Sequence, residues 1–159
     1  MSYANRFRIV GLPAGQFADA FALDDAARRQ AGIQLVVADR ATGFPCRVGL
    51  VDADVGDELL LLPFTHQPGD SPYRSSGPIF VRRGAATAKL PVGFIPGYVS
   101  SRLMSARAYD ARHCMVDASV CEGAVIAPEI ARLFADDRVA YLHLHNAKRG
   151  CYSCRVERA

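Results

Sequence analysis

Short apolar runs alternate with turn-forming residues along most of the chain, a pattern typical of strands joined by loops. The strands predicted from it cover residues 6–10, 34–37, 46–51, 58–64, 79–82, 106–109, 114–120, 138–145 and 151–156. We expect the runs 46–51 and 58–64 to pair as an antiparallel hairpin, because an acidic turn separates them.

Helical spacing of apolar residues is confined to a few short segments. The helices predicted from it cover residues 15–22, 25–31, 97–104 and 128–135. Asp24 is placed as the N-cap of the second. The last is the clearest, because one apolar stripe runs along it through Ile126, Ile130, Leu133 and Phe134. Many strands with three or four short helices predict the α+β class: one compact, mostly antiparallel domain over residues 1–159.

The strand predicted over 138–145 carries two histidines with the period of a strand. His143 and His145 are two residues apart and therefore point to the same face as Tyr141. Two imidazoles so placed could converge on a metal ion, but the sequence identifies no third ligand, so no metal site and no cofactor are assigned. The alternative is a partly exposed polar face of the sheet. The turn that follows adds donors from Asn146 and Arg149.

The segment 66–78 is rich in turn-forming residues and in chemically active side chains, and we interpret it as a functional loop. It contains His66, Tyr73 and Arg74. Together with Arg47 or Arg149, Arg74 could clamp a carboxylate or a phosphate. The alternative is a solvated connection in which the guanidinium pairs with an acid of the loop.

The five cysteines suggest one nucleophile candidate. Cys46 adjoins Arg47, but neighbouring residues of a strand point to opposite faces, which favours a small buried residue instead. Cys151 and Cys154 have C-x-x-C spacing, yet on a strand they face opposite ways and open no helix. Neither a zinc site nor a redox motif is therefore predicted there.

Composition and charge exclude several classes of protein. Half of the 159 residues are apolar, which is enough to form a hydrophobic core. The 19 basic residues are scattered along the chain among 16 acidic residues. A nucleic-acid binder concentrates its positive charge, so no nucleic-acid partner is expected. The longest apolar run, residues 59–64, is far shorter than the roughly 20 residues that span a bilayer, so no membrane association is expected. The amino-terminal residues do not resemble a secretory signal. An odd number of cysteines in such a chain is typical of reduced thiols, so we expect a cytoplasmic protein.

Several stretches resemble a known bacterial family, the domain-of-unknown-function family numbered 1203. They are Gly43–Arg47, the long string His66–Arg82, Arg107–Asp110 and Val139–Tyr152. The resemblance spans nearly the whole chain and implies a small, standalone, cytoplasmic bacterial protein. It brings no activity and no ligand residue that could be carried over.

The leading hypothesis is a small domain that binds an anionic small molecule where loop 66–78 meets hairpin 139–152. The residues assigned to this site are His66, Tyr73, Arg74, Arg47, His143, His145, Asn146 and Arg149. One alternative is a hydrolase or transferase with a histidine base, chosen from His66, His143 and His145, and either Cys46 as nucleophile or a histidine-bound metal. Another is a non-catalytic interaction module. The sequence makes no prediction of the oligomeric state.

Overall fold

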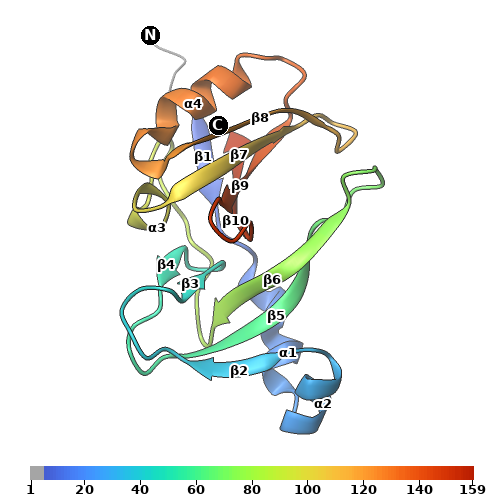
Figure 1. The fold of residues 1–159 in the computed structure, drawn as a ribbon, viewed down its shortest axis with the longest axis vertical. Coiled ribbons are helices and arrows are strands. Elements are labelled where there is room, and N and C mark those ends of the chain that lie inside the picture. Colours follow the sequence, from blue (N-terminus) through green and yellow to red (C-terminus); the bar gives the residue numbers. More distant parts are fainter. Residues whose placement is uncertain (1–5) are drawn as a thin grey trace.

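Two five-stranded sheets form the molecule in a computed structural model that describes residues 6–159 (Figure 1). Residues 1–5, on which part of the expectation about a secretory signal rests, lie outside the described residues. Sheets of mostly antiparallel strands with a few short helices confirm the predicted α+β class.

The first sheet, sheet A, joins the two ends of the chain. Its strands are all antiparallel and follow the order β1 (Phe7–Val10), β10 (Tyr152–Arg158), β9 (Tyr141–Asn146), β7 (Leu103–Tyr109) and β8 (Met115–Glu122). One face carries Leu142 and Leu144 into a core completed by α4 (Ile126–Phe134), through the buried side chains of Ile130 and Leu133. The other face, which carries the histidines of β9, is turned toward the second sheet.

The second sheet, sheet B, is built around a long two-stranded ribbon. Its order is β2 (Gln34–Val37), β5 (Glu58–Gln67), β6 (Ser75–Arg82), β3 (Pro45–Cys46) and β4 (Val51–Asp52). All pairs are antiparallel except the parallel pair of β6 with β3. Tyr152 of sheet A packs into the core of sheet B with Leu62 and Ile79, so the two sheets share buried side chains.

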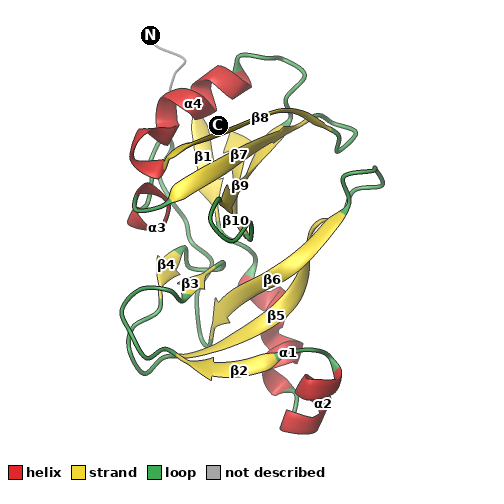
Figure 2. Ribbon diagram, viewed as in Figure 1, coloured by secondary structure: helices red, strands yellow, loops and turns green. Residues whose placement is uncertain are grey.

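The helices cap the two ends of the molecule (Figure 2). Near sheet A lie α3 (Gly97–Ser100) and α4, and near sheet B lie α1 (Ala18–Ala22) and α2 (Asp25–Gln30). The Asp24 side chain accepts a hydrogen bond from the Ala27 amide at 2.8 Å, which confirms the predicted N-cap. The helix expected over 97–104 is shorter, because Leu103 already belongs to β7. Within residues 6–159, no helix has the length and apolar character needed to cross a membrane.

The predicted hairpin of residues 46–51 with 58–64 is wrong. The chain leaves β3 after Cys46 and turns back through residues 47–50 to form β4, with Leu50 at a positive φ of 54°. Arg47, Val48 and Leu50 are nevertheless buried. A buried turn therefore carries the apolar composition of a strand, and composition alone cannot separate the two.

Nearly half of the expected loop 66–78 is strand. His66 and Gln67 end β5, and residues 75–78 begin β6, so only residues 68–74 connect the ribbon. Pro63 and Pro78 lie opposite one another in this pairing. Cross-strand pairing along a long ribbon overrides the local turn preference of proline, glycine and serine.

Candidate functional site

A bulge at the end of β5 turns His66 toward sheet A. The pairing of β5 with β6 shifts register between Phe64 and Gln67, and His66 and Gln67 are both buried although they are consecutive. A bulge breaks the alternation of a strand in this way and re-aims its side chains. His66 thereby joins a face of the other sheet.

The histidines of β9 occupy the face that the sequence predicted. His143 and His145 alternate with the core residues Leu142 and Leu144, but the exposed fractions of the histidine side chains are only 3% and 1%. The alternative of a partly exposed polar face is therefore wrong, because sheet B covers it.

Three imidazoles meet between the sheets, and we call His66, His143 and His145 the histidine cluster. The His66 ring centroid lies 4.9 Å from that of His145 and 6.2 Å from that of His143. One ring nitrogen from each residue lies within 4.8 Å of the others. The Tyr152 ring stacks on His66 at 5.6 Å and meets the other two rings edge-on. The sequence left the third imidazole unidentified, and the structure supplies it.

Hydrogen bonding fixes one ring of the cluster and leaves a nitrogen of each ring without a partner. His145 Nδ1 lies 2.9 Å from the carbonyl oxygen of Gly150, whose positive φ of 80° closes the β9–β10 turn. A carbonyl only accepts, so this Nδ1 carries the proton and Nε2 keeps the lone pair. Among residues 6–159, the buried nitrogens His66 Nδ1, His143 Nδ1 and His145 Nε2 have no hydrogen-bond partner.

The cluster is neutral at neutral pH. Burial, and then the neighbouring imidazoles, lower the pKa of His143 from 6.5 to about 3. Burial also lowers the pKa of His145 to about 4, with a further contribution from the Arg107 guanidinium. The pKa of His66 is lowered by the same two causes. A general base works best with a pKa near the operating pH, so these histidines are poorly matched to the histidine base of the enzyme alternative.

Tyrosines extend the cluster along the same face of sheet A. The Tyr141 hydroxyl accepts a hydrogen bond from Gln67 Nε2 at 2.8 Å and lies 2.7 Å from His113 Nδ1. Its ring stacks on Tyr109 at 5.4 Å. His113, in the β7–β8 turn, packs against Gly69, where an added Cβ would lie 2.4 Å from the imidazole carbon Cγ. The tip of the 68–74 loop therefore contacts this turn rather than the hairpin of β9 and β10.

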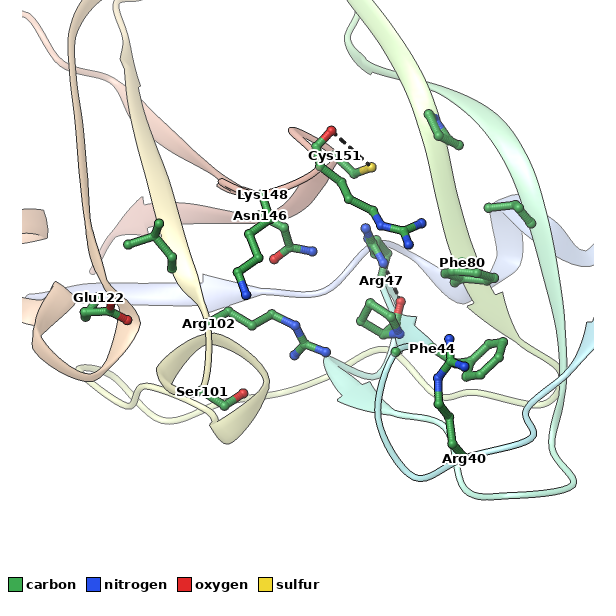
Figure 3. Close-up of a pocket in the computed structure, with 16 residues that line it drawn as sticks. Arg40, Phe44, Arg47, Phe80, Ser101, Arg102, Glu122, Asn146, Lys148 and Cys151 are labelled. Atoms are coloured by element: carbon green, nitrogen blue, oxygen red, sulfur yellow. Dashed lines mark hydrogen bonds between the residues drawn. The ribbon is translucent and has the colours of Figure 1, made fainter.

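A second feature, the basic pocket, opens between the sheets beside the cluster. Its volume is about 680 Å³, within the range of about 300–1,000 Å³ usual for small-molecule sites. Its basic lining residues, some of them visible in Figure 3, are Arg40, Arg47, Arg102, Lys148 and Arg149. The lining includes one acid, Glu122.

Arg47 connects the pocket to the cluster. Its side chain is 3% exposed, and the guanidinium donates to the carbonyl oxygens of Tyr152 at 2.8 Å and Pro45 at 2.6 Å. No carboxylate of residues 6–159 pairs with it. Tyr152 in turn stacks on His66. Within residues 6–159, the guanidinium is thus a buried positive charge whose hydrogen bonds go to backbone carbonyls.

The structure divides the residues assigned from the sequence into two groups. His66, His143 and His145 form the cluster, whereas Arg47, Asn146 and Arg149 line the pocket. Two candidates join neither group: Arg74 is exposed and donates to the Pro68 carbonyl within its own loop, and Tyr73 is exposed beside Tyr109. The alternative in which Arg74 pairs with an acid of its own loop is not observed, because Arg74 forms no ion pair within residues 6–159.

Cys46 lies outside both groups. Its side chain is fully buried, and its Sγ accepts a hydrogen bond from the Arg82 amide at 3.3 Å. Cys154 lies in the sheet A core, on the far side of a register shift from Cys151. Cys46 and Cys154 are therefore surrounded as small apolar core residues are, and not as nucleophiles or metal ligands are.

Sequence reasoning missed Tyr152, Arg107, Arg40 and Arg102. Arg107 and Tyr109 alternate on β7 and so share a face, a signal that the pattern does contain. That this face meets His143 follows only from the pairing of β7 with β9. Arg40 and Arg102 reach the pocket from loops and turns, for which the sequence has no comparable signal.

Comparison with known proteins finds one family. A family model described as "Protein of unknown function (DUF1203)" matches residues 43–158, which include the histidine cluster and the pocket lining other than Arg40. No curated protein and no solved structure matches the chain. Since the matched range covers well over half of the sequence, the chain belongs to this family, DUF1203, as the resemblance of its motifs indicated.

Proposed function

We propose that the protein binds an anionic small molecule in the basic pocket. The observation that carries this proposal is the buried Arg47 guanidinium, which has no carboxylate partner among residues 6–159. Burying an unpaired charge is costly, and an anion bound in the pocket would compensate it. A planar guanidinium also matches the geometry of a carboxylate or phosphate group.

Two exposed side chains of the β9–β10 turn support the same conclusion. Lys148 and Arg149 line the pocket and make no ion pair with an acid of the described chain. Arg102, by contrast, is neutralised by Asp52 at 2.6 Å. The free charges therefore gather around Arg47 and on the turn, and we assign the anionic group of the ligand to that part of the pocket.

The rest of the pocket suits an apolar portion of the ligand. Phe44 and Phe80 line it with their rings 5.5 Å apart, and Arg40 lies over the Phe44 ring. Figure 3 shows these rings across the pocket from Lys148. We therefore infer a phosphorylated or carboxylic metabolite with an aromatic or aliphatic part, because such sites combine apolar walls with a few placed polar groups.

A thermal-shift screen tests the proposal. The probes are phosphate, pyrophosphate, citrate, benzoate and a nucleoside monophosphate. A ligand at 100 times its dissociation constant stabilises the fold by about 2.7 kcal/mol, which raises the Tm of a chain of this size by about 5–10 °C. We expect at least one probe with both an anionic and an apolar part to do so.

A pair of variants tests where the ligand binds. The double variant Lys148→Ala/Arg149→Ala removes free charges from the pocket, and Arg29→Ala removes an exposed charge from α2. We expect the double variant to weaken binding at least about tenfold, that is by 1.4 kcal/mol or more, and Arg29→Ala to leave it unchanged. Equal binding by both variants would contradict the assignment.

The proposal extends to the cellular setting and to the choice among the alternatives. All five cysteines are free, which supports the proposal of a cytoplasmic protein, because thiols stay reduced in that compartment. The interaction-module alternative needs a contiguous apolar surface. The large exposed apolar side chains of residues 6–159 are spread over both sheets and several connections: Leu35, Val37, Val51, Val55, Tyr73, Val92, Phe94, Val120 and Val125. We therefore favour a small-molecule ligand over a protein partner.

A further inference from the structure

We propose that His66, His143 and His145 together bind one divalent transition-metal ion of the zinc class between the two sheets. The three residues come from two different sheets, so the ion would join sheet A to sheet B. This site is separate from the basic pocket and does not depend on its ligand.

The distances fit such an ion after a small closure. The ligand nitrogens lie within 4.8 Å of one another. In a tetrahedral site with Zn–N bonds near 2.0–2.1 Å, two ligand nitrogens are about 3.3 Å apart. The longest separation therefore has to shorten by about 1.5 Å on binding. This closure falls to the His66 and His143 rings, because the bond to the Gly150 carbonyl holds the ring of His145.

The unpartnered nitrogens are the second observation. His66 Nδ1, His143 Nδ1 and His145 Nε2 are buried and make no hydrogen bond with any part of the described chain. A buried polar atom left unsatisfied is costly, and three such atoms in one cluster of rings need a common explanation. The three nitrogens make no hydrogen bonds to one another, so such bonds do not explain them. A single cation explains all three, because it accepts one lone pair from each nitrogen.

The outer hydrogen bond of the cluster has the form found around metal-bound histidines. Such a histidine donates its second ring nitrogen to a carbonyl or carboxylate, which fixes the tautomer and orients the ring. His145 Nδ1 makes this contact with the Gly150 carbonyl at 2.9 Å. The turn glycine therefore orients the Nε2 lone pair of His145 toward the cluster.

The charge around the cluster determines the fourth ligand. Three neutral imidazoles leave a divalent ion with its full charge, and Arg107 acts electrostatically on all three histidines. Its guanidinium contacts Ser105 and pairs with no carboxylate of the described chain. An anionic fourth ligand, such as hydroxide or a carboxylate, offsets both charges, and three protein ligands leave a position for it.

The test is a zinc titration of the full-length protein after treatment with a chelator. Calorimetry in a buffer that does not bind metal is expected to show one Zn²⁺ per chain, and Co²⁺ in its place is expected to give the visible absorption of a tetrahedral site. His143→Phe keeps a ring in the aromatic packing and removes both nitrogens. We expect this substitution to weaken zinc binding by about 100-fold or more. Loss of a residue that only hydrogen-bonds to a metal ligand already lowers metal affinity about 10- to 100-fold.

Two controls separate this site from adventitious binding. His113→Phe makes the same change at a histidine outside the cluster, and Cys151→Ser/Cys154→Ser removes the C-x-x-C thiols. We expect both to bind zinc like the unmodified chain. If His143→Phe does not fold, His66→Phe replaces it, because His66 is the least buried of the three. Two results would overturn the proposal. One is that the unmodified chain does not bind one zinc ion per chain, and the other is that the cysteine variant loses zinc binding while the histidine variant keeps it.

Discussion

Acidification of the metal-free protein from pH 7 to pH 5 is expected to destabilise the fold through its buried histidines. In the unfolded chain these groups titrate near 6.5, whereas burial lowers the pKa of His143 to about 3 and that of His145 to about 4. Below pH 6.5 the unfolded state therefore binds more protons than the folded state, and stability falls as the pH falls. The loss continues until the pH reaches the folded-state values.

The magnitude follows from the width of that interval. Each histidine lowers the free energy of unfolding by about 1.4 kcal/mol for every pH unit below 6.5. At pH 5 the two together therefore lower it by about 4 kcal/mol relative to pH 7. This is a large part of the 5–15 kcal/mol that stabilises an ordinary domain, as the typical range of about 0.05–0.15 kcal/mol per residue implies. His66 contributes in the same direction.

Urea denaturation at pH 7, 6 and 5 measures this loss directly. The double variant His143→Phe/His145→Phe provides the comparison, because it keeps two rings in the packing and removes the groups that titrate. We expect the unmodified chain to lose stability steeply over this interval and the variant to lose much less. A free energy of unfolding that is equal at pH 7 and pH 5, or an unchanged slope in the variant, would refute the reasoning.

Other predictions follow from single contacts. Gly123→Ala places a Cβ 1.9 Å from the Val99 carbonyl oxygen and should lower the Tm by several degrees, whereas Gly97→Ala meets nothing within 4 Å and should be tolerated. Asp24→Ala removes the cap of α2 and should cost about 0.5–2 kcal/mol in chemical denaturation. Cys46 should be alkylated more slowly than Cys151 in the folded protein, as mass spectrometry can show, because only Cys46 is fully buried.

Local patterns predicted those elements whose side chains alternate or repeat regularly. The stripe of α4 is buried at Ile126, Ile130 and Leu133, as its spacing indicated. The strand 34–37 is found with the predicted bounds, and the alternation of β9 placed His143 and His145 on one face. In each case the pattern reflects a regular element with one face turned to a core, which periodicity detects directly.

Features that depend on tertiary pairing could not be predicted. The chain reverses at Leu50 inside an apolar run, and residues 75–78 are strand because they pair with β5. His66 reaches the other histidines only because a bulge re-aims it, and no spacing along the chain encodes a bulge. The sequence places Arg47 at an anion site as a clamp partner of Arg74, but its burial depends on a turn that the sequence predicts as strand.

The division of the assigned residues has a physical reason. The sequence treated histidines and arginines as one anion-binding set, yet a buried neutral imidazole and a guanidinium favour different partners. His143 and His145 offer lone pairs, which suit a cation, and Arg47 and Arg149 offer only N–H donors, which suit an anion. In the structure Arg47 bonds to the Tyr152 carbonyl oxygen, whereas His66 stacks on the Tyr152 ring. We therefore propose two sites where the sequence suggested one.

The most direct test of the anion-binding account is an NMR titration that follows the Nε–H groups of the arginines. The Arg47 Nε–H is buried and bonded to the Tyr152 carbonyl, so its signal is expected to be protected from exchange and resolved. Addition of the best anionic probe should shift the Arg47 signal together with those of the β9–β10 turn and leave Arg29 unchanged. Saturable binding of that probe with an unshifted Arg47 signal would contradict the account.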